Sequence, residues 1–176
     1  RQRQMCIRDR YTIESKSMKL FLNSFFDKTY SKQAEVINIL TERISKKCNS
    51  EVKIVVKTSF KTFNSDKFTN KAGLLVYEGF RSICPVTSQP DWGNIYLYSS
   101  TNTLNKKEIF DFLFSLRNHG GFHEYCIEKT FLYAKETFSV DHLEICGRFF
   151  RRGGIDINPI RSTQKKLFFE NFREFN

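Results

Sequence analysis

Residues 73 to 162 carry an order of strand-like and helix-like patterns that only a few folds accommodate. Two segments with strand character come first, two with helical periodicity follow, and two extended segments close the region. In chain order they are Gly73–Ile83, Asn94–Tyr98, Asn105–Arg117, Phe122–Glu136, Val140–Phe150 and Ile155–Ile157. Strands and helices that are grouped in pairs in this way are typical of an α+β fold.

The first half of the chain predicts a shorter version of the same order, two helices followed by one strand. The predicted helices are Glu14–Phe26 and a second one capped by Ser31, whose apolar stripe runs through Ala34, Ile37, Leu40, Ile44 and Cys48; the predicted strand is Val52–Lys57. Phe21–Phe25 and Phe112–Leu116 are similar and open the helical part of each half, which suggests duplication. We therefore expect a first module over 11–62, a linker over 63–71, a second module over 72–162 and a tail over 163–176.

Residues 1–10 are set aside in this prediction. Met5 to Arg10 reads like the translation of a transposon-end sequencing adapter, and segments of that origin are excluded from fold reasoning. Leaving them out removes four Arg and one Asp, which lowers the formal net charge from +10 to +7. It also implies that the authentic N-terminus, with the opening strands of the first module, is missing.

Composition favours a folded domain whose thiols are reduced. With 40% hydrophobic and 15% aromatic residues the chain can bury a core, and no apolar run approaches the roughly 20 residues of a membrane span. The remaining cysteines, Cys48, Cys84, Cys126 and Cys146, show no CxxC spacing, so neither a zinc site nor a disulfide framework is indicated. The basic charge fits a solvated surface, a phosphate-bearing cofactor or a nucleic acid.

Cys84 and Asp91 lie seven residues apart around a turn that Pro85 and Pro90 punctuate. A turn exposes side chains, and an exposed thiol beside an acid can form covalent intermediates. Free cysteines are, however, among the most buried residues, and most of them are inert. The segment alone leaves both interpretations open.

Two carboxylates stand at predicted helix starts. Glu124 follows His123 after a Gly-Gly turn, and Glu14 precedes Ser15 and Lys16. Each is either an ordinary first-turn acid or an acceptor for the adjacent N–H donors of a heterocycle. Likewise, His123 is either a capping residue or a proton donor near neutral pH, and Lys16 is either solvated or a phosphate ligand.

Arg151 and Arg152 precede Gly153 and Gly154. Guanidinium groups and glycine backbone N–H groups together suit a phosphate, although a basic hairpin turn has the same composition. No GxGxxG follows a predicted strand, so a Rossmann dinucleotide site is not indicated.

Together these segments resemble the NADPH-dependent 7-cyano-7-deazaguanine reductases of queuosine biosynthesis, nitrile reductases of the tunnelling-fold (T-fold) superfamily. The matching stretches are Ile13–Leu20, Cys84–Gly93, Ser115–Glu124 and Arg151–Pro159, in the family's order. Because the Glu14 stretch precedes Cys84 and the Glu124 stretch follows it, the two-module form of the family is the better match. The resemblance implies tandem T-fold modules, each an antiparallel sheet with a helix pair on one face.

The resemblance also implies roles for individual residues. Cys84 would be the nucleophile that forms a thioimide, Asp91 the proton donor and His123 a proton-transfer and orienting group. Substrate contacts would come from Ile13, Glu14, Ser15, His123 and Glu124, and NADPH contacts from Ser15, Lys16, Arg152 and Gly153, with no metal. The implied protein is a cytoplasmic homodimer that binds a small-molecule 7-deazaguanine and neither nucleic acid nor membrane.

Two other functions compete with this interpretation. A zinc-dependent pterin-type cyclohydrolase of the same superfamily would need a Cys/His metal set, and the three His of this chain lack that spacing. A basic, aromatic RNA-binding module would show salt-sensitive RNA affinity and no covalent adduct with the nitrile.

Overall fold

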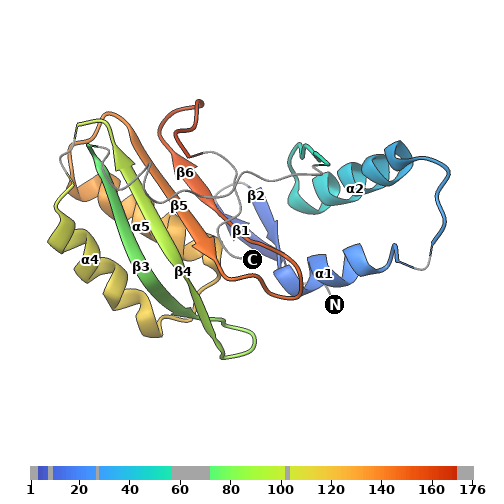
Figure 1. Cartoon of the computed structure of the whole chain (residues 1–176), viewed down its shortest axis with the longest axis horizontal. Coiled ribbons are helices and arrows are strands. Elements are labelled where there is room, and N and C mark those ends of the chain that lie inside the picture. The colour runs from blue at the N-terminus through green and yellow to red at the C-terminus, as the bar shows by residue number, and fades with distance from the viewer. Residues whose placement is uncertain (1–3, 8–9, 27, 57–71, 102–103, 170–176) are drawn as a thin grey trace. The chain divides into compact units, whose positions relative to one another are not determined.

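The computed structural model describes residues 4–7, 10–26, 28–56, 72–101 and 104–169 (Figure 1). The predicted linker over 63–71 lies outside these residues. The chain divides into two compact units. Unit 1 comprises Arg1–Ser59 with Gly153–Ile155, and unit 2 comprises Phe60–Arg152 with Asp156–Asn176.

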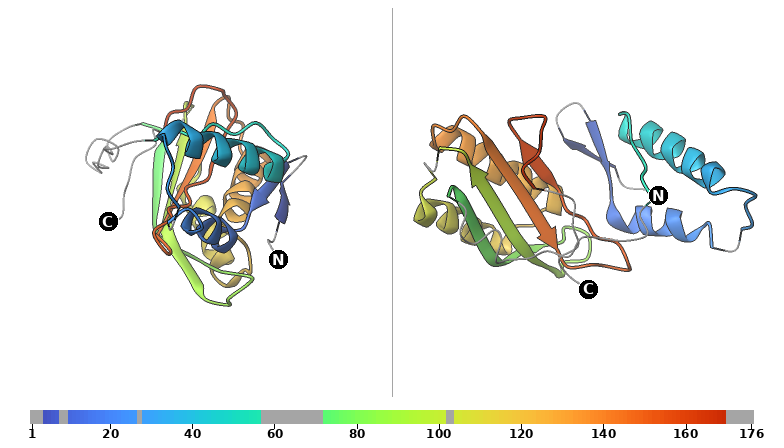
Figure 2. Two further views of the ribbon diagram at one scale, coloured as in Figure 1. Left: turned by 90° about the vertical axis from the view of Figure 1, so that its right-hand side faces the viewer. Right: turned by 45° about the horizontal axis from the view of Figure 1, so that its top comes forward.

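Unit 2 contains an antiparallel sheet with strand order β3-β4-β5-β6. The strands are β3 (Leu74–Ile83), β4 (Pro90–Ser99), β5 (Leu143–Phe149) and β6 (Ile160–Ser162), and the helices are α4 (Lys106–Ser115), the 3₁₀ helix η1 (Leu116–Asn118) and α5 (His123–Thr137). Both long helices cover the same face of the sheet (Figures 1 and 2). The α+β class and the predicted order of two strands, two helices and two strands are therefore confirmed. The position predicted for the last strand is wrong: Ile155–Ile157 forms no strand, and β6 lies at Ile160–Ser162, where it pairs with Glu144–Cys146 of β5.

The main core lies between the sheet and the two helices. Its fully buried members alternate along the strands, as a period of two requires, and recur at helical spacing along α4 and α5. They include Ile95 and Leu97 of β4, Leu143 and Ile145 of β5, Ile109 and Leu113 of α4, and Ile127 and Phe131 of α5. Each such side chain contributes about 1.5–3 kcal/mol when it is fully buried.

The second face of the sheet is covered by the described part of the C-terminal tail. The Glu144 carboxylate, on β5, accepts hydrogen bonds from the backbone N–H groups of Phe168 at 2.8 Å and Phe169 at 2.7 Å. Phe168 stacks on Tyr98 with ring centroids 3.9 Å apart, and Phe169 is buried against Tyr96. The tail, for which the sequence predicted no structure, is thus fixed through residue 169.

Unit 1 has a two-stranded sheet and two helices. Strand β1 (Gln4–Ile7) pairs antiparallel with β2 (Arg10–Ile13), and α1 (Ser15–Asn23) and α2 (Gln33–Cys48) follow. The two predicted helices are confirmed. Strand β1 falls within the segment that the sequence set aside, and the origin of residues 1–10 stays a prediction.

Two details of the unit 1 prediction are wrong. The N-cap of α2 is Lys32, because the Ser31 hydroxyl contacts the Glu35 carboxylate at 3.3 Å instead of a backbone N–H. Residues 51–56 form no strand, and Val55 and Val56 are more than half exposed. A strand requires a partner for its backbone groups, and none of the described residues pairs with this segment. Residue 57 lies outside the described residues.

The predicted apolar stripe of α2 is only partly buried. Ile44 is the buried member, Cys48 is half-buried and Ala34 is exposed. Among the described residues, no helix has both the length and the apolar character needed to cross a membrane.

Gly93 offers a test of the sheet packing. A Cβ at this position would lie 2.3 Å from the Arg148 carbonyl oxygen and 2.9 Å from the Phe149 Cα. Because backbone atoms cannot yield cheaply, we expect Gly93→Ala to lower the free energy of unfolding by about 1–3 kcal/mol or more. Urea denaturation followed by circular dichroism measures the loss. Gly120→Ala is the control, since a Cβ at that position would have nothing within 4 Å. Equal losses for the two variants would contradict the assigned β4–β5 contact.

Candidate functional site

The turn between β3 and β4 places Cys84 and Asp91 on one face of the hairpin. Ser82 pairs with Asp91 across the strands, and the Cys84 N–H donates to the Gln89 carbonyl at 2.8 Å, which continues that pairing into the turn. Residues two apart on a strand share a face, so Cys84, Ser82 and Asp91 point the same way. Diagonal neighbours of this kind lie about 7–8 Å apart, with their Cβ atoms somewhat closer. Ser88 closes the turn at φ 57°.

The Asp91 carboxylate is buried between two basic groups. Its Oδ2 lies 3.3 Å from His123 Nε2, and its Oδ1 lies 2.6 Å from Arg152 Nη2. Only 4% of Asp91 is exposed. Arg152 also donates to the Pro90 carbonyl. A buried carboxylate is stable only when it is paired, so these contacts explain how Asp91 remains in the interior. Three residues that the sequence singled out are thereby in contact.

His123 is held in place from two sides. Its ring stacks on Phe149 of β5, with centroids 3.9 Å apart and planes 11° apart. The segment before α5 is bonded to the end of β3: the Ile83 N–H donates to the His119 carbonyl and the Gly121 N–H to the Ile83 carbonyl, each at 3.0 Å. These bonds fix the start of α5 beside the Cys84 turn.

Glu124 occupies the first turn of α5, where no side chain caps the helix. Burial raises the pKa of its carboxyl, and the charge of Asp91 adds to this effect. The helix N–H and the positive charges of His123 and Arg161 oppose it. A desolvated carboxyl at a helix start is suited to accept hydrogen bonds from a ligand that brings two N–H donors.

The cysteines differ in their capacity to act as nucleophiles. Cys126 is fully buried, and burial raises its pKa to about 11, partly offset by the Ser82 hydroxyl. Cys146 is also fully buried, and burial raises the pKa of Cys48. Because the thiolate is the nucleophile, Cys126 is a structural thiol. Cys84 is half-buried, at the turn, on the same face as Asp91.

The two adjacent arginines have different roles. Arg151 forms an ion pair with Asp156 at 3.2 Å within its own turn. Arg152, whose side chain is 39% exposed, reaches Asp91. Gly153 and Gly154 follow at φ 57° and 81°, a left-handed conformation that glycine adopts readily. Both arginines of the predicted phosphate-binding pair are half-buried and ion-paired, Arg151 to Asp156 and Arg152 to Asp91.

The predicted residues of unit 1 stand at the start of α1. The Glu14 carboxylate accepts hydrogen bonds from the N–H and the hydroxyl of Ser17, both at 3.1 Å, and so caps the helix. The backbones of Ser15 and Lys16 form the first turn of α1, and their side chains lie outside what the structure describes.

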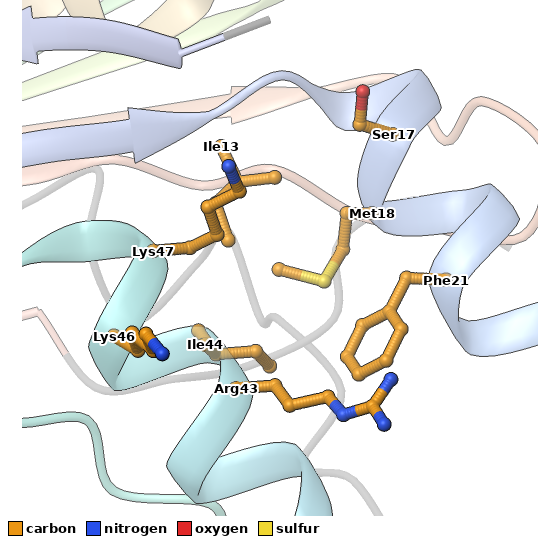
Figure 3. Close-up of a pocket in the computed structure, with 8 residues that line it drawn as sticks. All are labelled: Ile13, Ser17, Met18, Phe21, Arg43, Ile44, Lys46 and Lys47. Carbon is orange, nitrogen blue, oxygen red and sulfur yellow. The ribbon is translucent and has the colours of Figure 1, made fainter. Parts of the chain in front are cut away.

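A cavity of about 410 Å³ lies within unit 1 (Figure 3). Met18 and Phe21 of α1 point into it toward Ile44 of α2, and Arg43 lies at its edge. The full lining is Ile13, Ser17, Met18, Phe21, Arg43, Ile44, Lys46 and Lys47. Ile13 is the only one of these eight residues that the sequence assigned to substrate binding. The part of the chain that the structure describes holds no cluster of three His, Cys, Asp or Glu side chains arranged to bind a metal.

Comparison with known proteins gives two family matches. Residues 90–167 match a family described as "QueF-like protein", and residues 3–56 match "Nitrile reductase, 7-cyano-7-deazaguanine-reductase N-term". The NADPH-dependent 7-cyano-7-deazaguanine reductase of Hahella chejuensis is 32% identical over 92% of this chain and 69% of its own length. The protein of the same name from Coxiella burnetii (strain Dugway 5J108-111) is 31% identical, over 94% of this chain and 69% of its own length. The one from Legionella pneumophila (strain Lens) is 34% identical, over 89% of this chain and 65% of its own length.

The chain belongs to the 7-cyano-7-deazaguanine reductase family. The family resemblance drawn from the sequence is thereby confirmed. The two family matches fall in different units, with Glu14 in the first matched range and Asp91, His123 and Arg152 in the second. Cys84 lies between the two ranges. A solved archaeosine synthase QueF-Like structure has a TM-score of 0.46 and 14% identity, covering 53% of this chain and 95% of its own.

Sequence reasoning missed two residues that contact or influence the candidate site. Phe149 provides the stacking surface for His123, and Arg161 contributes a positive charge at Glu124. The sequence predicted a strand over Val140–Phe150 but did not single out Phe149, and only the structure shows that its ring meets His123. Arg161 had no local signal, because it lies far from Glu124 in the sequence.

The raised pKa of Glu124 predicts a pH-dependent cost to stability. The pKa of this carboxyl is higher in the folded chain than its ordinary value of 4.5. Its contribution to the free energy of unfolding is therefore fully present below pH 4.5 and is lost as the pH rises through the folded pKa. We therefore expect Glu124→Gln to raise the free energy of unfolding at pH 7.5 relative to the unchanged chain, with a smaller difference at pH 4.5. Urea denaturation at both pH values measures this. Glu136→Gln, an exposed position on the same helix, should show no such pH-dependent gain. A stability loss at pH 7.5 specific to Glu124→Gln would reject the burial argument.

Proposed function

We propose that this protein reduces the nitrile of 7-cyano-7-deazaguanine to an aminomethyl group with NADPH, as its relatives' names indicate for them. The observation that carries the proposal is the buried Asp91 carboxylate, which shares the hairpin face of Cys84 and contacts both His123 and Arg152. A half-buried thiol, an acid and an imidazole in this arrangement suit addition to a carbon–nitrogen triple bond.

In the first step Cys84 reacts as its thiolate, and its Sγ attacks the nitrile carbon. A carbon–sulfur bond forms, one π bond of the nitrile breaks, and the nitrogen takes a proton, which gives a thioimide with no leaving group. Asp91 supplies that proton, and His123, 3.3 Å from its carboxylate, replenishes it or orients the acid. Cys126 takes no part, since its thiol is neutral at physiological pH.

The substrate's heterocycle is bound by carboxylates at helix starts. Glu124 accepts hydrogen bonds from adjacent N–H groups of the deazaguanine edge, for which its desolvated position is suited. Glu14, with the Ile13 to Ser15 backbone, adds a second set of contacts from the first module. Both hydrogen bonds from Ser17 go to Oε2 of Glu14, and an ionised carboxylate has further acceptor sites with which it can contact the substrate.

The residues present fit NADPH. The Arg152 side chain is 39% exposed, and Gly153 and Gly154 adopt the left-handed conformation, in which successive backbone N–H groups can face an anion. Arg152, Gly153, Ser15 and Lys16 would hold the nucleotide, and Arg152 and Lys16 would favour its 2′-phosphate. When bound, NADPH supplies hydride; a nitrile becomes an amine by gaining two hydrides and two protons, so two NADPH are consumed in turn.

The tandem arrangement completes the proposal. Modules over 11–62 and 72–162, joined by a linker, divide the site between them, and two copies of the intact protein form a homodimer in the cytoplasm. The product serves queuosine biosynthesis, and the enzyme binds its small-molecule substrate rather than nucleic acid.

Intact mass spectrometry tests the covalent step. We expect incubation with 7-cyano-7-deazaguanine, without NADPH, to add the mass of one nitrile to the chain, because addition releases no fragment. Cys84→Ala should lose the adduct completely, while Cys126→Ala should keep it. An adduct that survives in Cys84→Ala would assign the nucleophile elsewhere.

Asp91→Asn tests the proton donor. The amide keeps the shape of the side chain but cannot deliver the acid proton, and general acids typically contribute 10²–10⁴-fold to rate. We expect NADPH oxidation with the nitrile to slow by at least about 100-fold, with little change in the dissociation constant for the nitrile, measured by calorimetry. An unchanged reduction rate would remove Asp91 from this role.

A further inference from the structure

Arg161 links the edge of the sheet to α5. It lies on β6 opposite Ile145 of β5, which is fully buried in the core beneath the helices, so Arg161 is on the helix-covered face of the sheet. Its Nε forms an ion pair with the Glu128 carboxylate of α5, and its Nη1 donates to the Ile160 carbonyl at 3.0 Å. Glu128 is only 8% exposed. The guanidinium group is therefore held between β6 and the helix.

Glu128 lies one helical turn after Glu124 on α5. Side chains four residues apart on a helix are neighbours, and both tilt toward the helix N-terminus, so the pair of Glu128 and Arg161 is directed toward Glu124. Burial raises the pKa of Glu124, and the positive charge of Arg161 opposes that rise, in agreement with this placement. Like charges at this helical spacing repel. Arg161 therefore compensates two carboxylates on one face of α5.

Other charged and titratable groups also face Glu124, from its own helix and from strands β4 and β6. They are His123, Cys126, Glu128, Asp91 and Arg161. Asp91 is negative, and His123 is in contact with it at 3.3 Å. Burial raises the pKa of Cys126 to about 11, so its thiol is neutral near pH 7. Within this group Arg161 is the cation that is not engaged with Asp91.

We propose that Arg161 is a positioning residue of the reductase site: its ion pair with Glu128 fixes a positive charge beside Glu124, and that charge holds Glu124 as the carboxylate that accepts the N–H donors of the substrate's heterocycle. The inference rests on the proposed function. A protonated carboxyl would present a donor to those N–H groups instead of an acceptor. Because Arg161 acts through Glu124, its loss weakens substrate binding under acidic conditions and leaves the covalent chemistry of Cys84 in place.

Isothermal titration calorimetry with 7-cyano-7-deazaguanine tests this role. Every chain carries Cys84→Ala, so that binding is measured without the covalent step, and dissociation constants are determined at pH 5.5 and pH 8.0. Removing a nearby positive charge raises the pKa of a carboxyl, so a larger fraction of Glu124 is protonated at the lower pH. We expect Arg161→Gln to weaken binding at pH 5.5 by about threefold to tenfold, and to leave the dissociation constant at pH 8.0 within about twofold.

Three further variants separate the charge of Arg161 from its packing. Arg161→Lys keeps the charge and should bind the nitrile as the Cys84→Ala chain does at both pH values. Arg161→Gln combined with Glu128→Gln replaces the ion pair by two amides, so that the buried Glu128 is not left without its arginine, and should again lose affinity at pH 5.5. Arg151→Gln is the matched control. It removes an arginine whose ion pair is with Asp156, so it should show no loss specific to pH 5.5.

A purely structural role for Arg161 gives a different result, because it would weaken binding equally at both pH values. That outcome, unchanged binding at pH 5.5 in Arg161→Gln, or a loss that persists in Arg161→Lys would each overturn the inference. If the Cys84→Ala chain fails to bind the nitrile although the unchanged chain forms the adduct, the Glu124 assignment and this inference fail while the covalent step stands. Absence of both binding and adduct would overturn the proposed function and the inference with it.

Discussion

The buried carboxylate of Asp91 is the constraint on which the site depends. A charge in the interior requires partners, and its partners come from separate parts of unit 2. His123 belongs to the start of α5, and Arg152 to the connection between β5 and β6. The sheet register, the helix start and the turn must therefore all be correct before the carboxylate is compensated. The arrangement that stabilises Asp91 is also the one that brings the candidate acid and imidazole beside the Cys84 turn.

The register of the β3–β4 pairing determines whether Asp91 lies on the same face of the hairpin as Cys84. A slip of one residue in the β3–β4 pairing would move Asp91 to the opposite face of the hairpin, away from α5. The Ile83–Gly120 bridge opposes such a slip, because it ties the last residue of β3 to the segment that leads into α5. The pairing irregularity between Tyr77 and Phe80 lies farther up the hairpin and leaves the register at Asp91 intact.

Sequence periodicity predicted the parts of this structure that depend on local patterns. Most strands and helices of unit 2 were predictable because their apolar residues repeat at the spacing of a strand or a helix. The segment over 51–56 has the same local strand character, but a strand forms only where another strand pairs with it. The docking of the tail was not predictable either, since Glu144 binds the backbone N–H groups of Phe168 and Phe169, which no side-chain pattern reveals.

The candidate site shows the same division between local and long-range information. Residue types identified Cys84, Asp91, His123 and Glu124, whereas the different tasks of the adjacent arginines follow only from three-dimensional contacts. Asp156, five residues after Arg151, holds the first arginine in the turn, which leaves the second to reach back to β4. Positive charge alone does not explain why the two adjacent arginines pair with different carboxylates. The charge of the buried carboxylate is therefore compensated by a residue of the turn between β5 and β6.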